Sequence, residues 1–507
     1  MRFAKVYSAE LEGIKGKLIE VEVDLNVGLH SFNIVGLADK ALSEAKERVG
    51  SAIKNTGLKP PTKENRKITV NLAPADVKKT GSQYDLAIAV GYLLATEQIK
   101  NQPGKSLFLG ELALNGDIRP IAGALNFATL AKKIDITEVF LPASNAGEAS
   151  LVKGISVFPL NNLADLINHL EKLKPITPFP KQDFVPEDVL SDVDIEDVRG
   201  QESAKRALMV AAAGGHNILM SGPPGSGKTM LAQAFNSILP PLSLEESIEA
   251  SEIWSAAGLL SGSHLKSRPF RMPHQTASPV SVIGGGQNSK PGEISLAHRG
   301  VLFLDELPEF RRDLLEALRQ PMESGEITVS RIRNNLTYPA RFTLVAAMNP
   351  CPCGYWGDTE KECKCSAYEV FKYQKKISGP LLDRIDIQIN VPRIKIDELK
   401  VPSSAIKGND IRKRVGRARA FQRERFMNNG LGIITNSEMN SKTCEKLTNL
   451  THGAEQLIKE IFDKVHLSTR GYYRILKTAR TIADLEESEI VEAPHISEAF
   501  QLRVREK

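Results

Sequence analysis

A glycine-rich stretch at residues 216–229 has the residue types and the spacing of a phosphate-binding loop. It reads His-Asn-Ile-Leu-Met-Ser-Gly-Pro-Pro-Gly-Ser-Gly-Lys-Thr, which matches G-x-x-x-x-G-K-[ST]. Glycines let the backbone curl so that successive N–H groups point at phosphate oxygens, and the following helix adds its partial positive charge. We expect Lys228 to reach the β- and γ-phosphates and Thr229 to hold Mg²⁺. The predicted nucleotide-binding residues are Gly222, Pro223, Pro224, Gly225, Ser226, Gly227, Lys228 and Thr229.

Two further apolar runs end in polar side chains that suit phosphate chemistry. Asp305 and Glu306 follow the run Val301–Leu304, about 80 residues after the glycine-rich loop. Here Asp305 is expected to complete the Mg²⁺ ligands and Glu306 to polarise the attacking water. Asn349 follows a third run, at 342–348, and its amide is suited to positioning that water. The alternative is that Asn349 is only a turn residue before a proline.

Four of the five cysteines lie close together in the sequence. Cys351, Cys353, Cys363 and Cys365 have the spacing C-x-C, nine residues, C-x-C. Four thiolates can complete a tetrahedral Zn²⁺ site, although this spacing is tighter than usual. Reduced loop cysteines and a redox pair are the alternatives. Cys444 stands alone and is expected to be a small buried apolar residue.

A basic segment, residues 411–425, contains seven Lys and Arg residues in 15. Ile411, Val415, Ala418 and Phe421 are expected to form one apolar helical face, which turns the arginines outward. The segment is either a surface that follows DNA or the solvated face of a helix.

The elements that must position these residues fall into consecutive regions. Residues 1–173 alternate strand-like runs with short helical patterns, which predicts a mixed α/β domain. Residues 174–190 are proline-rich and read as an extended linker. Residues 191–400 alternate apolar strands with helices, as a parallel sheet with helices on both faces requires. Residues 401–507 are predicted to be a helical lid domain.

Composition limits the class of protein. The chain has 507 residues, 66 Lys and Arg against 61 Asp and Glu, and a formal net charge of +5. This mildly basic balance is compatible with a nucleic-acid partner. Five cysteines exclude a disulfide scaffold, and the absence of 18 consecutive apolar residues excludes a transmembrane helix. The first residues lack the apolar core of a signal peptide. We therefore expect a cytoplasmic protein with no membrane partner.

The motifs together resemble those of the AAA+ ATPases. In chain order they are Gly-Pro-Pro-Gly-Ser-Gly-Lys-Thr, Val-Leu-Phe-Leu-Asp-Glu, Ala-Ala-Met-Asn-Pro and Leu-Leu-Asp-Arg-Ile-Asp. The stretch from Arg271-Met-Pro-His-Gln-Thr-Ala-Ser to Pro291-Gly-Glu-Ile-Ser-Leu-Ala-His-Arg-Gly resembles the magnesium-chelatase-like branch. From end to end the chain is similar to the bacterial ComM/YifB family.

The resemblance implies ATP and Mg²⁺ as cofactors, a homo-hexameric ring, and roles for individual residues. Asn349 matches sensor 1, Arg384 the arginine finger offered to a neighbouring subunit, and Arg470 the sensor-2 arginine. Spacing alone does not distinguish a catalytic Arg384 from a surface arginine. The stretch 198–201, Val-Arg-Gly-Gln, resembles the box on the adenine side of the nucleotide.

The resemblance also implies a contact with DNA. Residues 326–338 alternate like a strand pair around a polar turn, where related ATPases carry a hairpin before sensor 1. In related helicases this hairpin enters the pore of the ring. Arg331 and Arg333 are therefore the predicted DNA-binding residues, contacting phosphates. The alternative is a solvated hairpin with two ordinary arginines.

The N-terminal region, at 68–90 and 109–124, resembles the proteolytic domain of Lon, which has a ribosomal S5 domain 2-like fold. Lon-type hydrolysis uses a serine activated by a lysine. Here Gln83 occupies the serine position and Leu125 lies near the lysine position. Ser82 is one residue away, and Lys78 and Lys79 are too close in sequence to be the usual partner. We expect a protease-like fold that is not a protease and that serves ring assembly or DNA handling.

Four functions compete on this evidence. The ComM/YifB resemblance implies an ATP-driven DNA helicase or translocase that promotes branch migration in DNA uptake and recombination, on single-stranded or branched DNA. A magnesium-chelatase-type motor subunit acting on a protein partner is the alternative, although it leaves the Lon-like region unexplained. A protease lacks its nucleophile. A protein-remodelling ATPase is expected to show an aromatic pore loop, and none is evident.

Overall fold

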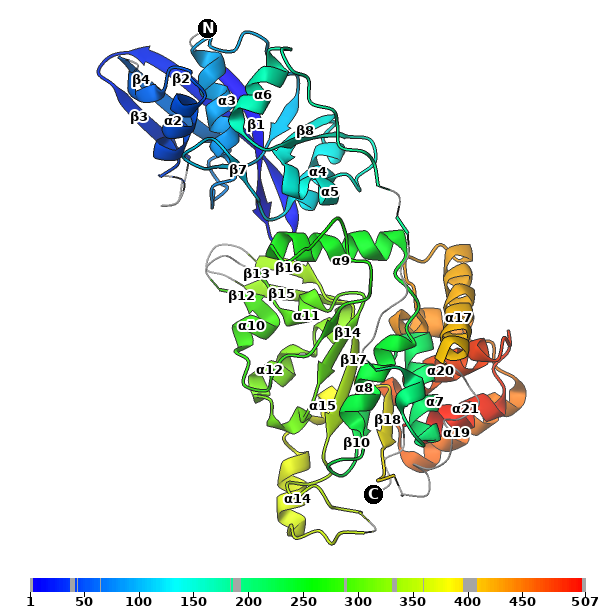
Figure 1. Cartoon of the computed structure of the whole chain (residues 1–507). Helices are drawn as coiled ribbons and strands as arrows, with labels where there is room; N and C mark the ends of the chain where they lie inside the picture. Colours follow the sequence, from blue (N-terminus) through cyan, green and yellow to red (C-terminus); the bar gives the residue numbers. More distant parts are fainter. Residues whose placement is uncertain are drawn as a thin grey trace. The chain divides into compact units, whose positions relative to one another are not determined.

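The chain folds into two compact units in the computed structural model (Figure 1). The structure describes residues 3–36, 42, 44–63, 65–182, 184–185, 193–286, 290–330, 335–358, 360–394 and 408–503. The first unit comprises Met1–Val185 and Leu244–Leu265, and the second comprises Pro186–Ser243 and Lys266–Lys507. Residues 244–265, expected within the ATPase core, thus belong to the N-terminal unit. The expected lid and core lie in one unit.

The first unit is built on a seven-stranded mixed sheet in the order β3-β4-β2-β1-β5-β8-β9. Alternate residues of β2 are buried, because one face of this strand covers the core and the other faces outward. The strand-like runs of the sequence lie inside β2, β4 and β8. The strands are β1 (Phe3–Glu12), β2 (Lys15–Val27), β3 (Ser31–Val35), β4 (Arg66–Ala73), β5 (Ser106–Phe108), β8 (Glu138–Pro142) and β9 (Ser156–Leu160), with a short pair β6 (Glu111–Leu112) and β7 (Ile118–Arg119).

Helices cover both faces of this sheet. One apolar core joins the sheet to α2, α3 and α6, and a second joins its other face to α4 and α5. Every residue of α3 is buried, as its sequence Asp-Leu-Ala-Ile-Ala-Val-Gly-Tyr-Leu-Leu-Ala requires. These helices are α2 (Ala45–Asn55), α3 (Asp85–Ala95), α4 (Ala124–Lys133), α5 (Ala146–Ala149) and α6 (Leu163–Leu170).

Helix α9 (Leu244–Ala257) joins the N-terminal unit through polar contacts with α4 and α5. Asn126 Nδ2 donates a hydrogen bond to the Glu252 backbone oxygen at 3.1 Å, and Thr129 Oγ1 donates to the Glu252 carboxylate at 2.8 Å. Ser255 Oγ donates to the buried Glu148 carboxylate at 2.5 Å. Burial raises the pKa of Glu148. These bonds fix α9 in the first unit, although the chain before and after it belongs to the second.

The second unit is built on a five-stranded parallel sheet in the order β11-β14-β17-β10-β18. Strand β17 lies between β10 and β14, so the carboxyl ends of these three strands meet at one edge. The predicted parallel sheet is therefore confirmed, and its polar strand ends lie side by side. The strands are β10 (Ile218–Ser221), β11 (Phe270–Arg271), β14 (Val301–Leu304), β17 (Thr343–Met348) and β18 (Ile387–Asn390).

The C-terminal helices share one apolar core with α7, α8 and the adjacent face of this sheet (Figure 1). The predicted helical C-terminus is confirmed. The helices on this side are α7 (Glu202–Gly214), α8 (Lys228–Ser237), α17 (Gly408–Asn428), α18 (Ser441–Leu447), α19 (His452–Val465), α20 (Thr469–Leu485) and α21 (Ala493–Gln501). The remaining helices are α10 (Pro279–Ile283), α11 (Glu293–Leu296), α12 (Arg312–Ala317), α13 (Pro321–Ser324), α14 (Ala367–Gln374) and α15 (Gly379–Leu382).

The basic helix α17 is tied to its neighbours by its arginines. Arg412 and Arg419 donate to backbone oxygens of Ser237 and Ala212, and Arg425 forms an ion pair with Asp484 at 2.6 Å. These contacts favour a structural role for the segment over a surface that follows DNA. The expected apolar face was wrong at one position: Phe421 is exposed, because the buried row continues through Gln422 and Phe426.

Two short antiparallel pairs complete the second unit, β12 (Gly284–Gly285) with β13 (Lys290–Pro291) and β15 (Glu326–Ser330) with β16 (Asn335–Pro339). The β15–β16 pair is the hairpin expected before sensor 1. Across all the described ranges, no helix combines the length and the apolar character needed to cross a membrane.

Candidate functional site: a nucleotide site at the strand ends

The glycine-rich loop connects β10 to α8 as its sequence predicts. Gly225 and Gly227 have φ values of +76° and +88°, which favour glycine. A Cβ added at either position would meet no atom within 4 Å, so the backbone conformation and not a lack of room favours glycine at both positions. Helix α8 begins at Lys228, directly after the loop, and the N–H groups of its first turn have no partner within the helix. This geometry fits the phosphate chain of a nucleotide.

Lys228 is positioned at the centre of the loop. Its Nζ donates to the backbone oxygens of Gly222 and Pro223, each at 2.8 Å, and to Asn349 Oδ1 at 3.3 Å. The residue is 8% exposed, and burial lowers the pKa of its ammonium group. The contact with Asn349 places the predicted sensor 1 side chain within reach of the phosphates that Lys228 would bind.

The two acids lie next to the loop. Thr229 Oγ1 donates to Asp305 Oδ2 at 2.8 Å, so a hydroxyl and a carboxylate oxygen converge on one point. Oxygen ligands of this kind suit Mg²⁺. Glu306 has a φ of +52°, a conformation that costs a non-glycine residue about 1–3 kcal/mol. Such strain is typical of functional positions, and here it turns Glu306 away from the strand direction.

The two predicted catalytic arginines lie together. Arg384 Nη2 and Arg470 Nη2 both donate to the carboxylate of Glu323, the latter at 2.9 Å. Arg384 is buried and also donates to the Pro380 backbone oxygen at 2.8 Å, whereas half of the Arg470 side chain is exposed. The sequence gives no sign of Glu323, which lies in the four-residue helix α13.

The predicted adenine-side box also lies near the loop. Gln201 Nε2 donates to the Pro392 backbone oxygen at 2.7 Å. The preceding carbonyl, of Val391, would lie 2.1 Å from a Cβ placed on Gly222. The box and the loop therefore pack against the same segment of chain.

The four clustered cysteines converge as their spacing suggests. Their sulfur atoms all lie within 4.8 Å of one another, and the Cys351–Cys353, Cys351–Cys363 and Cys353–Cys363 distances are 3.4, 3.6 and 3.5 Å. Tetrahedral Zn–S bonds of about 2.3 Å place sulfur atoms roughly 3.8 Å apart. The donor set therefore fits zinc.

The cysteine loop packs on the nucleotide loop. Gly354 has a φ of +87°, and a Cβ there would lie 2.5 Å from Pro224 Cδ. Only a residue without a side chain allows this approach. The cysteine loop is therefore in direct contact with the phosphate loop.

Some predicted residues lie elsewhere. Arg331 and Arg333 lie between β15 and β16, outside the described residues. In the N-terminal unit Gln83 donates to the buried Glu10 carboxylate at 3.2 Å, and Leu125 is fully buried in the apolar core. Neither residue offers a nucleophile or a base. Cys444 is buried, as expected.

The nearby hydroxyl of Ser82 and amine of Lys79 do not bind each other. Ser82 Oγ donates to the Glu111 carboxylate, and Lys79 Nζ donates to the Pro74 backbone oxygen. Lys79 is fully buried, and burial lowers the pKa of its ammonium group. Each group is thus bound to a neighbour other than the partner that Lon-type hydrolysis needs.

Comparison with known proteins agrees with this geometry. Three family models match in order: "Subunit ChlI of Mg-chelatase" at residues 21–145, "Magnesium chelatase, subunit ChlI" at 194–399 and "Magnesium chelatase, subunit ChlI C-terminal" at 406–503. The 38 kDa magnesium-chelatase subunit of Rhodobacter capsulatus is 30% identical over 176 residues, which cover 30% of this chain and 48% of that protein.

Two relatives match along the whole length. Competence protein ComM of Haemophilus influenzae is 42% identical over 511 residues, which cover 99% of this chain and 98% of that protein. The uncharacterized protein YifB of Escherichia coli is 40% identical over 511 residues, covering 99% and 97%. With its parallel sheet, phosphate loop and strand-end acids, this chain is an ATPase of the ComM type. It belongs to the ComM/YifB family of magnesium-chelatase-like AAA+ proteins.

Proposed function

We propose that the chain is the subunit of a homo-hexameric ATP-driven motor that moves along or unwinds DNA and promotes branch migration during DNA uptake and recombination. The observation that carries the proposal is full-length similarity to a competence protein, at 42% identity. Single-stranded or branched DNA would occupy the ring, and the motor would work in the cytoplasm.

The nucleotide chemistry follows from the residues at the strand ends. Bound ATP supplies the phosphoryl group that is transferred to water, and Thr229 and Asp305 are placed to hold its Mg²⁺. Lys228 offsets the charge of the phosphates. Glu306 accepts a proton from the attacking water, and Asn349, in contact with Lys228, orients that water. Arg384 completes the site of the adjacent subunit in the ring.

The β15–β16 hairpin supports a DNA contact. It lies directly before β17, the strand that precedes Asn349, so β17 alone separates the hairpin from the predicted phosphate sensor. We propose that Arg331 and Arg333 contact DNA phosphates in the pore. We also propose that the four cysteines hold a structural Zn²⁺ that shapes the loop beside the P-loop.

Stimulation of ATP hydrolysis by DNA tests the proposal. The purified protein should hydrolyse ATP faster with single-stranded or branched DNA, and Arg331→Ala/Arg333→Ala should lose strand separation while keeping the basal ATPase rate. Each lost phosphate contact should lower the log–log salt slope of duplex binding by about one. Unchanged binding and unwinding in the double variant would exclude the hairpin as the contact.

The second candidate is a motor subunit of the magnesium-chelatase type that acts on a protein partner. The three family models and the Rhodobacter subunit favour it. This function predicts an ATPase rate that DNA does not change, and an absence of any DNA unwinding. The same assay therefore separates the two candidates.

A further inference from the structure

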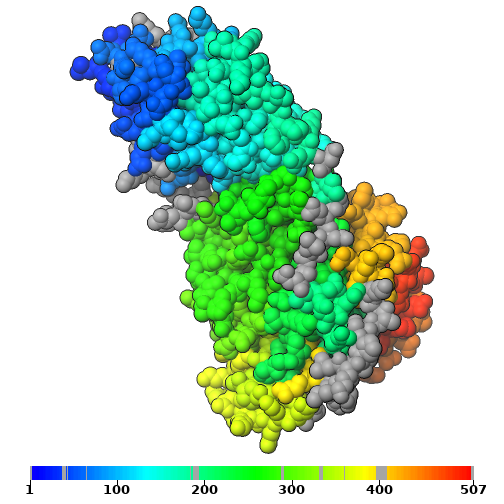
Figure 2. All heavy atoms as spheres, viewed as in Figure 1, coloured from blue at the N-terminus to red at the C-terminus, as the bar shows by residue number. Residues whose placement is uncertain are grey.

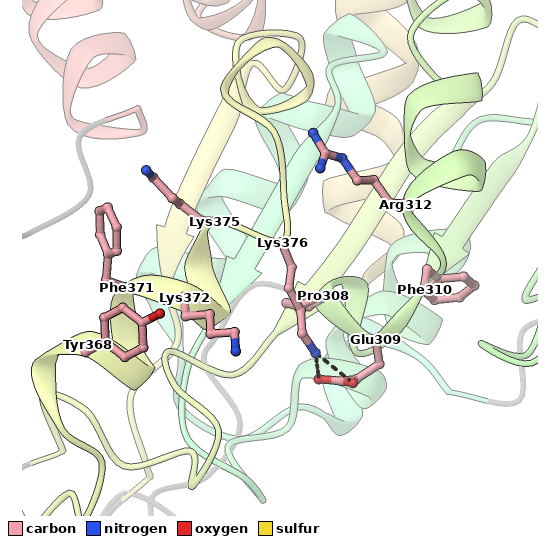
Figure 3. A pocket seen from close by; sticks show the side chains of 9 residues that line it. All are labelled: Pro308, Glu309, Phe310, Arg312, Tyr368, Phe371, Lys372, Lys375 and Lys376. Carbon is pink, nitrogen blue, oxygen red and sulfur yellow. Dashed lines mark hydrogen bonds and ion pairs between the residues drawn. The ribbon is translucent and has the colours of Figure 1, made fainter.

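A hollow of about 490 Å³ lies between helix α14 and the segment that follows the strand-end acids (Figure 3). Helix α14 comes directly after the cysteine loop, and this part of the chain, residues 351–374, forms one end of the second unit (Figure 2). The hollow is lined by α14 on one side and by residues 308–312 on the other. It is distinct from the loop that would hold the nucleotide phosphates.

Two aromatic rings of α14 face outward at this hollow. Tyr368 is 71% exposed and Phe371 is 55% exposed. They are three residues apart, so they lie on the same face of the helix. The core contacts of α14 are made by other residues, Val370 and Tyr373. The two rings therefore contribute little to folding, and exposed rings that cluster beside polar groups mark a binding surface.

The rim of the hollow is positively charged. Lys372 and Lys375 are exposed on the α14 side and Arg312 on the opposite side (Figure 3), and Lys375 Nζ lies over the Phe371 ring, 4.3 Å from its centre. The one carboxylate among the lining residues, Glu309, is neutralised by Lys376 at 3.0 Å. Three cations are thus left without a balancing carboxylate in the lining. They lie beside two exposed rings, and Lys375 covers one face of the Phe371 ring.

We propose that this α14 surface, formed by Tyr368, Phe371, Lys372, Lys375 and Arg312, binds single-stranded nucleic acid. Unpaired bases would stack on the two rings, and the three cations would hold the backbone phosphates. Exposed rings beside cations are the combination that single strands need, because every unpaired base offers a flat face and every linkage a negative charge. In a duplex the base faces are stacked on one another, so they cannot stack on the two rings. This inference rests on the proposed action on DNA.

The surface is also close to the site of hydrolysis. Glu309, which pairs with Lys376 just after α14, lies three residues after Glu306, and its backbone N–H donates to the Glu306 backbone oxygen at 2.8 Å. A strand bound on α14 would therefore act on the element that carries the predicted catalytic acid. DNA bound there could change the ATPase rate through the Lys376–Glu309 ion pair and the turn that joins Glu309 to Glu306.

Binding of a fluorescein-labelled oligothymidylate by the full-length protein, followed by fluorescence anisotropy at several salt concentrations, tests the proposal. Tyr368→Ala/Phe371→Ala should weaken binding about ten-fold or more with an unchanged salt slope, because stacking releases no counterions. Lys372→Ala/Lys375→Ala should lower the slope by about 0.7 per lost phosphate contact. The matched control, Lys442→Ala/Lys446→Ala, removes two exposed lysines from α18 and should change neither quantity.

An abasic strand of the same length separates stacking from charge. The wild-type protein should bind it as weakly as Tyr368→Ala/Phe371→Ala binds oligothymidylate, and the aromatic variant should bind both strands alike. Binding of a fluorescent ATP analogue at wild-type affinity shows that each variant is folded.

Three results would overturn the proposal. If the wild type binds single strands and the aromatic variant binds them equally well, the α14 assignment is wrong and the proposed function stands. If the aromatic variant instead loses ring assembly in sedimentation, while its assembled fraction binds DNA normally, the surface is a contact between protein subunits. If the wild type neither binds DNA nor is stimulated by it, the proposed function fails as well.

Discussion

Arg384 and Arg470 share one carboxylate, that of Glu323, although they are separated by 86 positions in the sequence. The residues come from different elements: Arg384 follows α15, and Arg470 lies in the first turn of α20. The two positive charges repel each other, and the carboxylate between them offsets this repulsion. Glu323 therefore holds both arginines in one place.

Loss of this carboxylate should impair turnover more than binding. Glu323→Ala is expected to lower kcat by about ten-fold, since a misplaced charge stabilises the transition state less well, with little change in the Kd for ATP. If Glu323 acts through Arg384, adding Glu323→Ala to Arg384→Ala should cost nothing further. Steady-state ATPase assays of the two single variants and the double variant measure this. If the losses of kcat in the two single variants multiply in the double variant, Glu323 does not act by positioning Arg384.

Substitutions of Lys228 and Glu306 should separate nucleotide binding from hydrolysis. Lys228→Ala is expected to lose nucleotide binding, because its ammonium group lies at the centre of the loop. Glu306→Gln should bind ATP at near wild-type affinity and hydrolyse it at least about 10²-fold more slowly, as expected for the loss of a general base. Fluorescent-nucleotide titration and phosphate release give the two quantities. Near wild-type turnover in Glu306→Gln would assign the water-activating role to another residue.

Mixed rings test whether Arg384 acts across a subunit boundary. Arg384→Ala alone should lower turnover about 10³-fold or more, by analogy with other arginine fingers. Mixing it with Lys228→Ala subunits should restore part of the activity, because intact sites form where an unmodified Arg384 faces an unmodified Lys228. Native mass spectrometry would verify the mixture. If verified mixed rings show no recovery, the finger lies elsewhere.

The strand-end site was predictable because its signals are local. Glycine spacing, an apolar strand and the helix after it define the phosphate loop within 15 residues, and parallel strands bring their carboxyl ends to one edge. The close approach of Thr229, Asp305 and Asn349 to this loop follows from that topology. The hairpin before β17 was predictable for the same reason, since alternation and a polar turn lie within one short segment.

Relationships between distant segments were not predictable. The sequence of α9 indicates a helix, but nothing local shows that it packs on α4 rather than on the adjacent sheet. The prediction for Phe421 was wrong because residues 421 and 422 both lie close to the apolar face of the helix, and the sequence favours Phe421 over Gln422 as the buried residue. In the structure Gln422 is buried and Phe421 is exposed. Glu323 has no sequence signal at all, because its importance comes from two arginines that only the fold brings together.

Stability of the N-terminal unit should depend on pH through Asp85. Burial raises the pKa of this carboxyl from 3.8 to about 6, even though Arg48 donates to it at 2.6 Å. A carboxyl with a raised pKa binds its proton more tightly in the folded state. Its contribution to stability is therefore greatest below about pH 4 and falls as the pH rises to about 6, by on the order of 2–3 kcal/mol.

The variant Asp85→Asn should remove this dependence. The difference in unfolding free energy between wild type and variant is expected to change by that amount between pH 4 and pH 7. Trp254 lies in α9 of the same unit, so urea unfolding followed by its fluorescence in a Trp356→Phe background reports on this unit. Parallel pH profiles for the two proteins would show that Asp85 does not titrate in this range.

Metal removal should affect the nucleotide site through the contact between Gly354 and Pro224. Protein purified without added zinc should contain close to one zinc per chain, and Cys351→Ser/Cys363→Ser should contain none. Loss of this packing is expected to weaken ATP binding about ten-fold, which corresponds to about 1.4 kcal/mol. Elemental analysis and nucleotide titration measure the two effects on the same samples.

Cys444→Ala is the matched control for the metal, because this cysteine is buried among the C-terminal helices and lies outside the cluster. It should keep both the zinc and the affinity for ATP. A wild-type protein that is folded and free of metal would leave the four cysteines as ordinary reduced thiols. A variant that loses zinc but binds ATP normally would contradict this prediction. It would show that the contact between Gly354 and Pro224 does not need the metal.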